Sequence, residues 1–207
     1  MFIPKKTKSE ETFDDHNINR CKIDKNIFSI DPLGCQDIDD AMSIETINNN
    51  TVVGIHIAQP IVFLSKEEIL SKSMSQFSTL YLEDQRKDLW GDSITNKSSL
   101  LQNELRPAYT LFFHYDSELN LVKVDNYPSL IENKKVLTYD NAVNYSHAQE
   151  LFNFTKKLTN LNDYHDLVSY WMIKTNLSVG DILKDRGKIP YRVNKISFFD
   201  ETELNLP

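Results

Sequence analysis

The segment that most constrains this chain is an acidic loop held between two apolar runs. Phe28–Ile30 is typical of a short buried strand, and Met42–Glu45 is typical of another. The residues between them, 31–40, include Pro32 and Gly34, which indicate a turn. The apolar flanks on both sides predict that this loop is embedded beside a sheet.

Four carboxylates lie within this loop: Asp31, Asp37, Asp39 and Asp40. Like charges a few Å apart raise one another's pKa values unless a cation compensates them. Carboxylate oxygens are hard ligands that suit Mg²⁺ or Mn²⁺ better than Zn²⁺. A divalent ion at a phosphodiester can orient it, generate a hydroxide from bound water and neutralise charge on the leaving oxygen.

Two other interpretations of the acidic loop stay open. An Asp-rich stretch with Pro and Gly is usually a solvated turn, and composition alone favours that interpretation. A calcium loop of the EF-hand kind is a poor match, because the run from Asp37 to Asp40 lacks the Gly and Glu that such a loop needs after its acidic positions.

The rest of the sheet is predicted from runs rich in β-branched and aromatic residues. Val52–Ile57 follows an Asn-rich turn, Tyr109–Tyr115 and Leu119–Val124 form a hairpin, and a separate strand is expected near Ser129–Leu137. Residues 1–26 show no sustained apolar period and are expected to be a leader or arm, followed by the catalytic domain over residues 27–207.

Helices are expected in three places. Ser65 and Glu68 form a capping-box pattern that predicts a helix over 66–78. Apolar stripes of helical spacing predict two more, over 151–161 and from 167 to 184. The expected fold class is therefore α+β, with a mixed or antiparallel sheet and packed helices.

Composition limits the classes of function. With 40% hydrophobic and 11% aromatic residues the chain can build a core. The two cysteines support neither a disulfide framework nor a zinc site. The N-terminus has no apolar stretch typical of a secretory signal and no run is long enough to span a bilayer, so an intracellular location, cytoplasmic or nuclear, and no membrane partner are expected. The net charge of −7 argues against a simple nucleic-acid binder, so any contact with RNA must be local.

The acidic loop resembles the signature of the ribonuclease II or RNB family, and is especially similar to its eukaryotic exosome-nuclease branch. The similarity lies in Ile30-Asp31-Pro32-x-Gly34-Cys35-x-Asp37-Ile38-Asp39-Asp40-Ala41. Collinear matches extend from about residue 27 to 194, in the runs Gly54–Ala58, Tyr81–Leu82, Ser98–Leu100, Arg106–Pro107, Leu167–Val179 and Pro190–Val193.

The resemblance implies a Mg²⁺-dependent exoribonuclease, with Mn²⁺ as a possible substitute, which hydrolyses single-stranded RNA in the 3′→5′ direction to nucleoside 5′-monophosphates. It implies that Asp31 and Asp40 are the firmest metal ligands, that Asp37 supports them, and that Asp39 is the catalytic carboxylate. Tyr81 would stack on the 3′-terminal nucleotide, a role that suits an aromatic in a single-strand channel. A core tyrosine at the end of a helix is the alternative for Tyr81.

Departures from the family pattern leave a second function open. Gln59 stands where the family has Asp, and Leu89–Gly91 replaces a Met-Leu-Pro-like run. The chain stops before the downstream arginine-rich motif and the C-terminal binding domain of the family, so a second polypeptide or a missing C-terminal half is expected to complete the domain. The alternative function is a truncated or split, catalytically inactive remnant that binds RNA or protein, and a calcium-stabilised interaction domain ranks below both.

Overall fold

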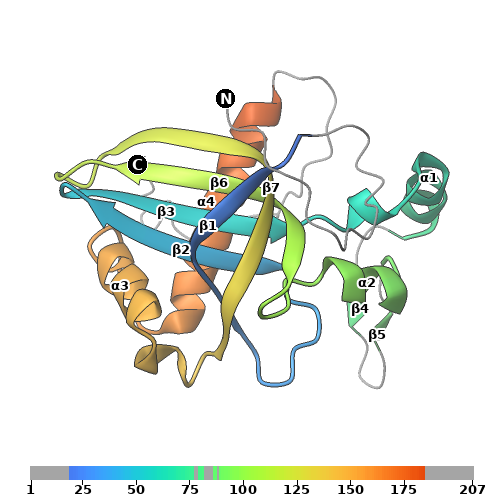
Figure 1. Ribbon diagram of the computed structural model, residues 1–207, viewed down its shortest axis with the longest axis horizontal. Coiled ribbons are helices and arrows are strands. Elements are labelled where there is room, and N and C mark those ends of the chain that lie inside the picture. Colours follow the sequence, from blue (N-terminus) through green and yellow to red (C-terminus); the bar gives the residue numbers. More distant parts are fainter. Residues whose placement is uncertain (1–18, 77–78, 82–85, 88, 185–207) are drawn as a thin grey trace, which may run out of the picture. The chain divides into compact units, whose positions relative to one another are not determined.

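The structure is a computed structural model that describes residues 19–76, 79–81, 86–87 and 89–184 (Figure 1). The elements along the chain are β1 Cys21–Asp31, β2 Asp40–Ile47, β3 Asn50–Ala58, α1 Lys66–Ser75, β4 Leu80–Tyr81, β5 Arg86–Lys87, α2 Asp92–Ser98, β6 Leu105–Tyr115, β7 Leu121–Thr138, α3 Ser146–Thr155 and α4 Tyr164–Leu183, with 3-10 turns at Pro60–Phe63 and Ala142–Asn144. The chain divides into two compact units, residues 1–171 and 172–207, and the boundary falls inside α4. The first unit contains every strand that the structure describes, together with the acidic loop.

Five strands close into a barrel in the order β1-β2-β3-β6-β7. β1 and β7 pair in parallel, and the other neighbours pair antiparallel. The expected α+β class with a mixed sheet is confirmed, whereas closure of that sheet into a barrel was not predicted. A smaller two-stranded sheet is formed by β4 and β5.

β7 is one strand of 18 residues, although the sequence predicts a break between Val124 and Ser129. Its length follows from its two neighbours. It pairs with β6 from Leu121 to Glu132, and with β1 from Ser129 to Thr138. One continuous strand thus pairs with β6 along its first part and with β1 along its second part, and the β1–β7 pairing is the seam that closes the barrel.

β1 begins at Cys21, so its first residues belong to the segment expected to be a leader or arm. The turn between β2 and β3 is the expected Asn-rich one. Asn48 and Asn49 both have positive φ, 51° and 65°, which is the backbone of a type I′ hairpin turn and which asparagine tolerates better than most residues.

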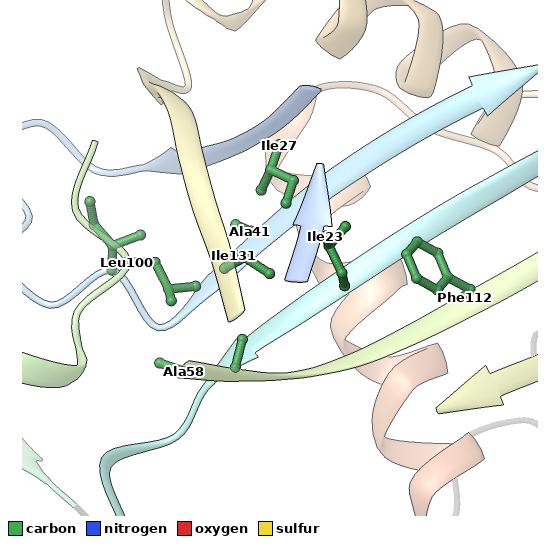
Figure 2. Close-up of a cluster of buried hydrophobic side chains, with 9 residues drawn as sticks. Ile23, Ile27, Ala41, Ala58, Leu100, Phe112 and Ile131 are labelled. Atoms are coloured by element: carbon green, nitrogen blue, oxygen red, sulfur yellow. The ribbon is translucent and has the colours of Figure 1, made fainter. Parts of the chain in front are cut away.

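Both faces of the central strands are buried. On the outer face Phe113 packs against Trp171 of α4 with ring centroids 5.4 Å apart, and Tyr115 packs against Phe154 of α3 at 5.2 Å. The opposite face therefore lines the barrel interior. It contributes to a buried cluster, most of which Figure 2 labels, formed by Ile23, Ile27, Ile38, Ala41, Ala58, Leu100, Ala108, Phe112 and Ile131.

A chain of polar side chains crosses the barrel interior. His56 Nε2 lies 3.1 Å from Ser43 Oγ, His56 Nδ1 lies 2.8 Å from Thr110 Oγ1, and Thr110 Oγ1 lies 2.7 Å from Ser129 Oγ. Burial, and then the charge of Lys25, lowers the pKa of His56 from 6.5 to about 3, so the imidazole is neutral. A fully buried ring with both nitrogens hydrogen-bonded to neighbouring side chains is typical of a structural histidine.

Gly54 has no side chain, and the space beside its Cα is filled by the neighbouring side chains of this polar chain and by Phe112. A Cβ at this position would lie 2.4 Å from Ser43 Oγ, 2.7 Å from Phe112 Cε1 and 3.1 Å from His56 Nε2. Any larger residue here would force the side chains of Ser43 and Phe112 to shift.

The helices agree with expectation in kind more than in extent. The capping box of α1 is confirmed, because Glu68 N donates to Ser65 Oγ and Ser65 N donates to Glu68 Oε2. α1 ends at Ser75, earlier than expected, and α2 was not predicted. The family-like run at Pro190–Val193 lies outside the described residues. In the described part of the chain, no helix has the length and apolar character needed to cross a bilayer.

Candidate active site

The acidic loop joins β1 to β2 at one rim of the barrel. Asp31 is the last residue of β1 and Asp40 is the first residue of β2. Between them Cys35 N donates to Pro32 O at 3.1 Å and Gly34 has a φ of 80°, so the predicted turn is present. The two outermost carboxylates are thus fixed by strands, and the two between them are carried by the loop.

Asp31 is a buried carboxyl with only 8% of its surface exposed. Burial raises its pKa from 3.8 to about 6, against the opposing effect of a hydrogen bond from Ser29, and the charge of Asp37 adds to the rise. Among the described residues, Oδ2 of Asp31 has no hydrogen-bond partner. A buried carboxylate oxygen without a donor is costly, and a bound cation would satisfy it.

Asp40 is half-buried, and it pairs across the β2–β3 ladder with Ile57. Burial, and then the charges of Asp31 and Asp39, raise its pKa from 3.8 to about 7. Asp31 and Asp40 are therefore electrostatic neighbours, as the crowding of carboxylates in the loop predicts. Each makes the negative charge of the other less favourable.

Asp39 is exposed, while its backbone is tied to the barrel. Its carbonyl accepts a hydrogen bond from Ala58 N at 2.8 Å, beside the end of β3. The side chain is thus presented to solvent next to Asp40. An exposed carboxylate beside two less accessible ones can exchange protons with water while they stay in place.

Asp37 is half-buried in the middle of the loop. Cys35 Sγ lies 3.5 Å from Asp37 O and 3.7 Å from Asp37 Oδ1. Burial, and then the charge of Asp31, raises the pKa of the Cys35 thiol from 9.0 to about 11, so the thiol is protonated at neutral pH. A protonated thiol is a poor metal ligand, which leaves the carboxylates as the donors.

The carboxylates of the acidic loop offer few ligands for a divalent cation. Within the described residues, no three His, Cys, Asp or Glu side chains converge as a metal-holding group. Mg²⁺ does not need such a cage, because it is usually held by one or two carboxylates while waters and substrate phosphates supply the other ligands. The Asp31–Asp40 pair, with the unpartnered Oδ2 of Asp31, fits that mode of binding.

Sequence reasoning missed a tyrosine at this site. Tyr139 directly follows Thr138, which stands opposite Asp31 in the β1–β7 register. Burial, and then the charges of Asp31, Asp40 and Cys35, raises the pKa of Tyr139. Its ring stacks on His165 of α4 with centroids 3.6 Å apart and planes at 14°. Only the long-range register brings Tyr139 here, so no local pattern could have found it.

The remaining predicted residue, Tyr81, lies in β4, where its backbone pairs with Arg86 of β5. Its side chain lies outside the described part of the structure, so its stacking role stays a prediction. Gln59, the departure noted in the sequence, follows β3, and Arg20 Nη1 donates to its Oε1 at 2.7 Å.

Comparison with known proteins decides the family. The family model of the RNB domain matches residues 22–162. The chain belongs to the RNB family. The acidic loop at the barrel rim lies within this RNB match.

Relatives and solved structures agree with that membership. The exosome complex exonuclease dis3 of Schizosaccharomyces pombe is 37% identical over 122 residues, which are 58% of this chain and 13% of that protein. Among solved structures, an active-site mutant of the Dss1 exoribonuclease from Candida glabrata has a TM-score of 0.66 at 17% identity, covering 86% of this chain and 32% of that one. RNase R of Mycoplasma genitalium, bound to ribose-methylated single-stranded RNA, has a TM-score of 0.54 at 21% identity, covering 86% of this chain and 27% of that one. At these identities the two structures show that this chain shares their fold.

Proposed function

We propose that this chain carries the carboxylate centre of a metal-dependent exoribonuclease that hydrolyses single-stranded RNA from its 3′ end and releases nucleoside 5′-monophosphates. The observation that carries the proposal is the pair of Asp31, which is buried, and Asp40, which is half-buried. Both have raised pKa values, and Asp39 is exposed beside Asp40. The 37% identical exonuclease and the RNA-bound fold neighbour support the choice of reaction and substrate.

In this proposal Asp31 and Asp40 hold Mg²⁺ or Mn²⁺, and Asp37 supports them from the middle of the loop. The bound cation would supply charge neutralisation at the terminal phosphodiester and acidify the attacking water. The carboxylate of Asp39 accepts the proton from that water, because it is the exposed member of the cluster and stays reachable by solvent. Tyr81 remains the residue predicted to stack on the terminal base.

The test uses the purified chain and a single-stranded RNA labelled at its 5′ end, with Mg²⁺ or with EDTA. A ladder of products that shorten from the 3′ end with Mg²⁺ and vanish with EDTA supports the proposal. Asp39→Asn should abolish turnover and leave RNA binding nearly intact, because it removes one charge and no stacking contact. Asp24→Asn, the same change at an exposed position of β1, is the matched control.

Two outcomes would count against the proposal. Near-normal, metal-dependent trimming by Asp39→Asn would remove that residue from the reaction centre. A mobility shift of the RNA without any product, for wild type at saturating Mg²⁺, would favour the non-catalytic remnant that binds RNA.

A further inference from the structure

A buried segment that the proposed function does not use lies against the acidic loop. Ser99 and Leu100, between α2 and β6, are 1% and 0% exposed. Ser99 Oγ accepts a hydrogen bond from Ile38 N at 2.9 Å and donates to Gln36 O at 3.0 Å. One hydroxyl thus holds the loop backbone on both sides of Asp37.

Leu100 extends this contact by one residue. Its amide donates to Ile38 O at 2.9 Å. Both backbone polar groups of Ile38 are therefore bound to the segment, and its side chain is buried in the same cluster as Leu100, which Figure 2 labels. Because Asp37 and Asp39 flank Ile38, fixing its backbone restricts the directions in which both carboxylates leave the chain.

The acidic loop has two arms, Asp31 at its β1 end and residues 37–40 at its β2 end. Asn133 of β7 connects the same segment to the Asp31 arm. Its Nδ2 donates to Leu100 O at 2.8 Å and to Ser29 Oγ at 3.2 Å. Ser29 in turn hydrogen-bonds the carboxyl of Asp31. Asn133 is 1% exposed and stands where the β1–β7 register shifts, so its amide is held from several sides.

These bonds form one continuous path from Asp31 through Ser29, Asn133 and Leu100 to the backbone at Ile38. The path joins the two arms without passing through the carboxylate of Asp37, Asp39 or Asp40. The separation between Asp31 and the group at residues 37–40 is thus set from behind the site by neutral, buried groups.

We propose that Ser99 and Asn133 are positioning residues of the carboxylate centre, which hold its two arms at the spacing that a divalent cation requires. The inference rests on the proposed function. Hydrogen-bonding partners outside the ligand set typically change metal affinity or activity by about 10- to 100-fold when they are removed. A merely structural contribution would lower stability and leave the affinity of the folded protein for the cation unchanged.

The test compares two adjacent buried serines in the full chain. Ser99→Ala removes the loop contact, whereas Ser98→Ala removes a hydroxyl that, among the described residues, bonds within its own helix to Thr95 O. The probe is Mn²⁺, whose free concentration is followed by electron paramagnetic resonance during titration of each folded variant. We expect about tenfold weaker Mn²⁺ binding for Ser99→Ala, unchanged binding for Ser98→Ala, and recovery in Ser99→Thr, which keeps the hydroxyl.

A second variant addresses the other arm and guards against misfolding of the first. Asn133→Ala should weaken Mn²⁺ binding in the same way and lower kcat on single-stranded RNA more than it raises KM. Equal Mn²⁺ affinity in wild type, Ser99→Ala and Asn133→Ala would overturn the inference alone. A wild type that binds no Mn²⁺ would overturn the proposed function and the inference with it.

Discussion

Replacing Asp31 by asparagine should stabilise the metal-free chain at alkaline pH. The carboxyl of Asp31 has a pKa of about 6 in the folded protein against an ordinary value of 3.8, mainly because it is buried. The folded state therefore binds the proton more tightly than the unfolded state does. The stability that protonation contributes is complete below pH 3.8 and is lost as the pH rises through about 6.

The size of the effect follows from the shift. Since one pKa unit corresponds to 1.36 kcal/mol, the change from 3.8 to about 6 costs the ionised protein about 3 kcal/mol at pH 8. Asparagine carries no charge and avoids this cost. It also weakens the hydrogen bond from Ser29, which lowers the stability of the variant by about 1 kcal/mol. The net expectation is a gain of about 2 kcal/mol, or about 4–8 °C in Tm for a chain of this size.

The assay is thermal or urea unfolding in EDTA at pH 8 and at pH 4. Asp31→Asn should be more stable than wild type at pH 8 and close to it at pH 4, whereas Asp24→Asn, at an exposed position of the same strand, should match wild type at both. Saturating Mg²⁺ should narrow the gap at pH 8 by binding the wild-type carboxylates. A variant no more stable than wild type at pH 8, or one equally stabilised at both pH values, would refute the electrostatic reasoning.

Three further substitutions test the packing around the barrel. Gly54→Ala should lower the free energy of unfolding by about 2 kcal/mol in urea, because the added methyl would overlap Ser43 Oγ. An unchanged midpoint would show that the neighbouring side chains move aside at no cost. Ser65→Ala should lower stability by about 1 kcal/mol through loss of the capping box, and restoration by Asp at the same position is the check on that cause. Thr155→Val keeps the shape but leaves the indole N–H of Trp171, now bound at 2.9 Å, without its acceptor, so we expect a loss of about 2 kcal/mol by fluorescence-detected unfolding; a smaller loss than for Ser65→Ala would contradict it.

The acidic loop could be predicted because its signals are local. Pro32 and Gly34 indicate the turn, and the apolar runs before and after them predict the two strands that it connects. The Asn48–Asn49 turn and the Ser65 cap are likewise short-range patterns, since each depends on the backbone preferences of one or two side chains.

The barrel could not be predicted in the same way. Its closure depends on the parallel pairing of β1 with β7, in which Asp31 stands opposite Thr138, far away in the sequence. The first half of β1 also carries mostly exposed polar residues, so Cys21–Asn26 has too few apolar positions to indicate a strand. Polar residues such as Asn133 and Ser29 acquire a role only once that pairing brings them together.

The seam between β1 and β7 also bears on the order of events during synthesis. It joins segments roughly a hundred residues apart, and contacts of such separation form late because loop-closure entropy opposes them. The hydrogen-bond path behind the carboxylates includes Asn133, so it cannot be complete until β7 has left the ribosome and docked. A nascent chain would thus carry the acidic loop as an ordinary solvated turn, and the burial of like charges would begin only when the barrel closes.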